Sequence, residues 1–265
     1  MSTALAERPR RSGAARYRQT LWLLTSRDLK VRYSTSALGY VWSILDPLVM
    51  AGIYYFVFQV VFQRDVGAEP YIVFLLSGLL PWMWFNGAVS DSTRAFLREA
   101  KLVRSTKIPR TIWVLRLVGS KGIEFALSLP VLALFAVLGG AHLQWQVVFF
   151  PLAMVMQAVL VAGVGLIVAP LVVFFRDLER ATKLALRFLF YASPIIYGTN
   201  DLPEQLHVLA AFNPLSGIFG LYRSAFFPEQ LDVLEAVVGG GMCLALLAVG
   251  LVVFRRSERA VLKEI

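Results

Sequence analysis

Long apolar stretches separated by short charged loops constrain this chain more than any other feature. Its 265 residues are 58% hydrophobic and only 16% charged, with a mean hydropathy of +0.66. A helix that crosses a bilayer needs about 20 mostly apolar residues. We therefore predict an all-α integral membrane protein with six transmembrane helices, at about 38–62, 71–92, 113–138, 146–174, 182–198 and 236–254.

The placement of lysine and arginine predicts the orientation, because cytoplasmic loops carry an excess of both. Of the 26 such residues, 22 lie before the first span, in the second and fourth loops, or after the last span. The other loops hold only Arg64 and Arg223. Both termini are therefore expected in the cytoplasm. The net charge of +9 follows alternate loops rather than one continuous face, so nucleic acid is not an expected partner.

The predicted organisation is a single membrane domain with two cytoplasmic extensions. Residues 1–35 form a basic tail and an interfacial helix that covers roughly Tyr17 to Tyr33. Residues 36–254 form the six-span domain, and residues 255–265 form a C-terminal tail. No short apolar region with a cleavage site follows the basic tail, so we expect no cleaved signal peptide.

The chain carries no recognisable source of energy or catalytic motif. It has no GxxxxGK[ST] phosphate loop, no GxSxG elbow and no pair of acidic motifs that could hold magnesium. Cys243 is the only cysteine, and His142 and His207 lie far apart, which is not the spacing of a metal site. We predict no catalytic residue, metal or cofactor in this chain. Active transport would need an ion-coupled site in the membrane or a separate ATPase.

Ionisable residues within the spans are the candidates for an ion-coupled site. Each costs about 2.5 to 3.5 kcal/mol on insertion scales and is often functional. Asp46 lies in the first span beside Pro47, and Lys121 and Glu124 share one face of the third span at i, i+3. A local ion pair or a proton relay would explain the last two residues. We favour the ion pair, which lowers its own insertion cost.

Several motifs carry a resemblance to a known family. The run RDLKVRYSTSALGYVWSILDPLVM resembles the first membrane segment of the permease subunit of type-2 ATP-binding-cassette exporters, in the branch that exports polysaccharide, O-antigen and teichoic acid. The residues that match are Arg32, Tyr33, Gly39, Trp42 and Pro47. GLLPWMWF, KLVRSTKIPR, SPIIYG and FNPLSGIFGLYRSAFF extend the likeness along the chain. Lys101 departs from the family, which often has asparagine there.

The resemblance implies a working unit of two copies of this chain, a homodimer, with two copies of a cytoplasmic ABC ATPase that binds ATP and Mg. It also implies the bacterial cytoplasmic membrane and a substrate that is a polyprenyl-linked glycan of the O-antigen, galactan or teichoic-acid type. A lipid or small-molecule efflux permease of the same family is an alternative. An ion-coupled carrier and a membrane-bound glycan-assembly enzyme are alternatives from other classes.

Two groups of cations have expected roles. A short coupling helix at about 96–109 would contact the ATPase through Arg98, Lys101, Arg104, Lys107, Pro109 and Arg110. In the interfacial helix, a concentration of donors could meet the pyrophosphate of the substrate, namely Arg27, Lys30, Arg32 and Tyr33. Attraction to anionic lipid would explain the same interfacial charge without any substrate contact.

The external features are predicted from capping and periodicity. Asn213 followed by Pro214 is a typical helix start, and the apolar stripe that includes Phe219 and Tyr222 follows it. This helix is too short to span the membrane. We predict that it and a second short helix near Pro203 are external re-entrant helices, at about 200–228, that form a gate. An ordinary interfacial loop helix is the alternative. Aromatic residues that could line a sugar path are Tyr54, Tyr55, Phe58, Tyr191 and Tyr197.

Overall fold

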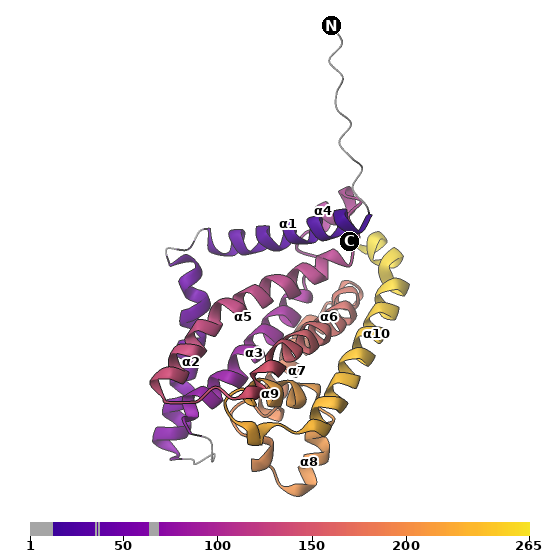
Figure 1. Cartoon of the computed structure of the whole chain (residues 1–265). Coiled ribbons are helices and arrows are strands. Elements are labelled where there is room, and N and C mark those ends of the chain that lie inside the picture. The colour runs from indigo at the N-terminus through magenta and orange to yellow at the C-terminus, as the bar shows by residue number, and fades with distance from the viewer. Residues whose placement is uncertain (1–12, 35, 37, 64–68) are drawn as a thin grey trace.

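The computed structural model describes residues 13–34, 36, 38–63 and 69–265, and within these it contains helices and no strand (Figure 1). Five helices are long and apolar enough to cross a membrane, which confirms the predicted all-α membrane class. Three of them are single α-helices: α3 (Tyr71–Ser92), α5 (Ile112–Leu138) and α10 (Val233–Glu264). The span Trp42–Val61 consists of α2 (Trp42–Tyr55) and a π-helical turn after it. The span Trp145–Phe174 consists of a 3₁₀ turn followed by α6 (Phe150–Phe174). The tail before residue 13 and Arg64 lie outside the described residues.

The sixth predicted span, 182–198, has a different form. Helix α7 (Asp177–Ala192) has only 16 residues, and residues 193–197 after it are bent rather than helical. Glu179 near its start pairs with Arg94 beyond the last residue of α3, whereas the Ile196 carbonyl accepts from Tyr71 at the first residue of α3. The short helix and the bent segment together therefore run the length of α3. Six membrane crossings stay a prediction.

The remaining helices lie at the two ends of the bundle. Figure 1 shows α1 (Gly13–Tyr33) across one end, with α4 (Ala100–Ser105) and the C-terminus there too. We call this the basic end. Helices α8 (Glu204–Ala211) and α9 (Pro214–Arg223) lie at the opposite end. Helix α10 continues through residues 255–264, which were expected in the C-terminal tail.

The core is centred on α3, which is buried along most of its length. Its side chains Phe74, Leu75, Leu76 and Leu79 are almost completely buried against α5, α6 and α9. Helices α6 and α10 approach so closely that a side-chain carbon at Gly163 would meet the backbone of Leu246 and Leu247. Small residues commonly permit such backbone contact between membrane helices. This close packing fixes the frame on which both ends are built.

Candidate functional site

A buried arginine joins three elements at the basic end. Arg116, near the start of α5, is 3% exposed. Its Nη1 lies 2.7 Å from Asp28 Oδ1 on α1 and 3.1 Å from Glu99 Oε1, the residue just before α4. Arg27 on α1 also pairs with Glu99. These four residues, the basic-end ion cluster, bind the interfacial helix and the short helix α4 to the membrane helix α5.

The carboxylates of the ion cluster respond differently to their surroundings. Burial raises the pKa of Glu99, but the hydrogen bond from Arg27 and the charges of Arg116 and Arg27 outweigh it, and the net pKa lies below the ordinary value. Burial is the larger effect at Asp28, so its pKa lies above the ordinary value despite Arg116 and Arg27. Glu99 therefore stabilises the cluster most when ionised, whereas ionised Asp28 is partly opposed by its own desolvation.

A second set of ion pairs lies further along α1. Arg32 Nη2 is 2.7 Å from Asp91 Oδ2, and Arg32 Nη1 is 3.1 Å from Glu124 Oε1. Lys121 Nζ lies 2.7 Å from Glu124 Oε2, so the local ion pair predicted on α5 is present.

Two residues assigned to a pyrophosphate, Arg27 and Arg32, thus have carboxylate partners within the chain. Lys30 is exposed and pairs with no described residue, and Tyr33 lies beside Glu124. Their role toward a headgroup stays a prediction.

The predicted coupling segment presents unpaired cations. Helix α4 covers only 100–105 of the predicted 96–109, because Thr106 is extended and Pro109 cannot donate a helical hydrogen bond. In this segment, four exposed cations form no ion pair with any residue that the structure describes: Arg98, Lys101, Arg104 and Lys107. Pro109 is exposed, and Arg110 Nη1 donates to the Ile108 carbonyl at 3.2 Å. A groove of about 1330 Å³ lies beside α4, between the ion cluster and Glu179.

Aromatic rings gather where α2, α3 and α7 meet. The Tyr54 ring lies 5.5 Å from Phe190 and 6.3 Å from Phe58, and Trp82 lies 5.5 Å from Phe190, all between centroids. Phe190 and Trp82 were not predicted, although both fall within apolar runs that the sequence displays.

The other predicted path residues lie around this group. Tyr191 is 64% exposed beside Phe190, Tyr55 packs near Tyr71, and the Tyr197 hydroxyl donates to the Tyr191 carbonyl at 3.0 Å. A path role for these aromatics stays a prediction.

At the opposite end, the helix start predicted at Asn213 is confirmed. The Asn213 side chain accepts from the Leu215 backbone amide at 3.1 Å and donates to Ser193 Oγ at 2.9 Å, and Pro214 opens α9. Phe219 and Tyr222 are fully buried, with the Tyr222 ring 4.7 Å from that of Phe150. The cap thus also ties α9 to the bent segment after α7.

Arg223, at the end of α9, was expected in an external loop but is 2% exposed. Its Nη2 donates to the Ile195 carbonyl at 2.6 Å and its Nη1 to the Tyr197 carbonyl at 3.1 Å. The guanidinium lies over the Phe74 ring at 3.7 Å from the centroid. Non-helical backbone at membrane depth needs donors for its carbonyls, and Arg223 supplies them. The charge pattern could not show this, because the partners lie 26 and 28 residues away.

The five long apolar helices pack as one bundle, which makes this a polytopic membrane protein of helical type. The chain belongs to the ABC-2 type transporter family, whose model matches residues 19–227. It is 35% identical to the O-antigen export system permease protein RfbA of Klebsiella pneumoniae, over 90% of this chain and 92% of the relative. It is 29% identical to RfbA of Myxococcus xanthus, over 84% and 85%. It is 24% identical to the polysialic acid transport protein KpsM of Escherichia coli, over 95% and 98%.

Proposed function

We propose that this ABC-2 permease exports a lipid-linked polysaccharide of the O-antigen, galactan or teichoic-acid type across the bacterial cytoplasmic membrane. The observation that carries the proposal is the likeness to O-antigen export permeases over nine-tenths of the chain. Two copies of this chain would work with two cytoplasmic ATPase subunits, which bind ATP and Mg. The basic end, with both termini, would face the cytoplasm, in keeping with the excess of lysine and arginine there.

The ion cluster supports a route for coupling. Helix α4 presents exposed cations to a partner, and Glu99 directly before it is held by Arg27 of α1 and Arg116 of α5. A displacement of α4 by the ATPase would therefore move α1 and α5 with it. Contacts that run between packed helices in this way are a physical basis for transmitting a shift.

The test is charge reversal at Arg104 of α4 and at Lys107, two residues past its end. Arg104→Glu with Lys107→Glu should leave the permease inserted but abolish binding of the ATPase or the dependence of export on ATP, because both cations are exposed and held by nothing else. Arg255→Glu with Arg256→Glu is a control of equal charge change at exposed positions of the same end. Co-purification of the ATPase and export by reconstituted vesicles are measured. Normal assembly and export in the α4 variant would remove α4 as the coupling element.

The efflux alternative makes a different prediction for the substrate. A permease of lipids or small molecules would show no stimulation of ATP hydrolysis by a polyprenyl-linked glycan. Stimulation of the reconstituted complex by that glycan, and not by the free polyprenyl phosphate, would support polysaccharide export.

A further inference from the structure

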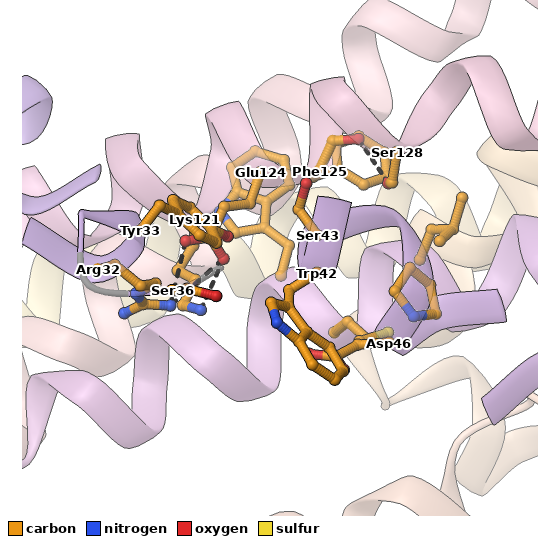
Figure 2. A pocket seen from close by; sticks show the side chains of 14 residues that line it. Arg32, Tyr33, Ser36, Trp42, Ser43, Asp46, Lys121, Glu124, Phe125 and Ser128 are labelled. Atoms are coloured by element: carbon orange, nitrogen blue, oxygen red, sulfur yellow. Dashed lines mark hydrogen bonds and ion pairs between the residues drawn. The ribbon is translucent and has the colours of Figure 1, made fainter. Parts of the chain in front are cut away.

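A small cavity lies where α1 ends and α2 begins. It has a volume of about 300 Å³ and is lined by the end of α1, the first turns of α2, and α3 and α5. Figure 2 shows its polar side chains in two groups, one around Arg32, Lys121 and Glu124, and the other formed by Trp42 and Asp46. The proposed function uses neither the cavity nor the second group.

One of the two carboxylates in the cavity wall, Asp46, is unlike the other charged groups there. Arg32 is held by Asp91 and Glu124, and Lys121 is held by Glu124. Asp46 forms no ion pair or hydrogen bond with any residue that the structure describes, and Figure 2 draws no interaction at it. Asp91 lies outside the wall, and counting it as the second partner of Arg32 leaves Asp46 as the carboxylate without a partner. An unpaired carboxylate suits a ligand with one positive charge.

The depth of Asp46 indicates where such a ligand would come from. Asp46 is the fifth residue of α2, about 6 Å along the helix from its start. The polar headgroup region on each side of a bilayer is about 5 to 8 Å thick. Because α1 lies across this end of the bundle, Asp46 falls at the boundary between headgroups and acyl chains.

The second group in the wall has the chemistry of an ammonium site. The indole of Trp42 is 42% exposed, and Figure 2 shows it beside Asp46. An indole face attracts cations, most strongly where water is scarce. A carboxylate next to it can accept the N–H groups of a primary ammonium in charge-assisted hydrogen bonds. A pyrophosphate, by contrast, would face an unpaired carboxylate.

We propose that this cavity binds the primary ammonium headgroup of a zwitterionic phospholipid, of the phosphatidylethanolamine type, from the leaflet at the basic end. Asp46 accepts hydrogen bonds from the ammonium, and Trp42 covers it. The phosphate of the same lipid lies toward Arg32, whose side chain remains 33% exposed. The bound lipid holds the corner between α1 and α2. The site shares Arg32 with the predicted pyrophosphate contact, whereas Trp42 and Asp46 belong to the lipid site alone.

The test measures binding of defined lipids to the purified full-length permease in detergent. Phosphatidylethanolamine, phosphatidylcholine and phosphatidylglycerol of equal chain length are titrated, with bound lipid read by native mass spectrometry and stability by thermal unfolding. Phosphatidylethanolamine should bind most tightly. Asp46→Asn should weaken it by about tenfold or more, because a hydrogen bond to a charged group is lost, and should leave phosphatidylglycerol unchanged. Asp177→Asn is the control, since Asp177 is exposed at the same end of the bundle.

Three outcomes separate the sources of the positive charge. Soluble phosphoethanolamine that competes as well as the lipid would replace a lipid site by a free amine site. A shift in the dimer equilibrium of Asp46→Asn without any change in lipid binding would assign the missing cation to a second copy of the chain. Equal binding of all three lipids would overturn the proposal outright. If Asp46→Asn does not fold, Trp42→Leu keeps the carboxylate and should still lose most of the preference for phosphatidylethanolamine.

Discussion

Two nearly fully buried arginines, one at each end of the bundle, are satisfied in opposite ways. Arg116 at the basic end is 3% exposed and pairs with two carboxylates from separate elements, α1 and the residue before α4. Arg223 at the other end is 2% exposed and donates to the backbone carbonyls of a single bent segment. The carboxylates of Asp28 and Glu99 each retain 18% exposure, so water can hydrogen-bond to them if Arg116 is lost. Buried carbonyls have no such substitute, so loss of the Arg223 guanidinium should cost more stability than loss of an exposed cation.

The largest effect should come from Arg223→Met. This change leaves the carbonyls of Ile195 and Tyr197 without donors in an apolar setting, and each lost bond from a charged donor costs about 1.5 to 3 kcal/mol. We expect a loss of at least about 3 kcal/mol in the free energy of unfolding, measured by thermal or denaturant unfolding in detergent. Arg187→Met, at an exposed position of α7, should change it by less than about 0.5 kcal/mol. Similar losses in both variants would show that the two carbonyl bonds of Arg223 contribute little to stability.

A smaller effect is expected when the space beside Arg223 is filled. In Gly78→Ala, the new carbon would lie 2.8 Å from Arg223 Nη2 and 3.1 Å from the Ile195 carbonyl oxygen. Overpacking costs about 1 to 3 kcal/mol, offset by up to about 1 kcal/mol from the better helix propensity of alanine. Gly52→Ala in α2 meets nothing within 4 Å and should be neutral or stabilising. We expect the melting temperature to fall in Gly78→Ala and not in Gly52→Ala. Changes of equal sign would show that the Arg223 side chain moves aside at little cost.

The smallest expected effect is on how the free energy of unfolding changes at acid pH. The pKa of Glu99 is lower in the folded protein, so its contribution is complete above about pH 4.5 and is lost as the pH falls through the folded pKa. The pKa of Asp28 is raised, so its protonation in the folded protein regains stability as the pH falls toward the ordinary value of 3.8. Glu99→Gln should therefore flatten the acid limb of stability against pH, and Asp28→Asn should steepen it. Unfolding at a series of pH values from 3 to 7 compares the slopes, and identical slopes would contradict the assignment.

Local signals predicted much of this architecture. Apolar length alone located α3 to the residue and three other long helices to within four residues, since bilayer thickness fixes how much apolar chain is needed. It missed the last ten residues of α10, which continue past the predicted end at 254. The cap at Asn213 was equally predictable because its bond to Leu215 is local.

Long-range contacts were not predictable in the same way. Arg27 and Arg32 read as free interfacial cations, because Glu99 and Asp91 lie 72 and 59 residues away in the sequence. Arg223 read as an external charge for the same reason. No local sequence pattern distinguishes a cation that binds a ligand from one that forms an ion pair or hydrogen bond within the fold.

Helix α10 connects the two ends described above. Its 32 residues extend about 48 Å, well beyond a hydrocarbon core of about 30 Å. Near its start, Glu235 is buried where Gly217 of α9 abuts its backbone. Towards its end, the Phe254 ring lies 6.0 Å from Phe96, and Val261 shares a buried cluster with Val103 of α4. A tilt of about 5° in a rod of this length would move one end by about 4 Å relative to the other. One helix could thus convert a small rotation at the basic end into a displacement of about 4 Å at the opposite end, without any bend in between.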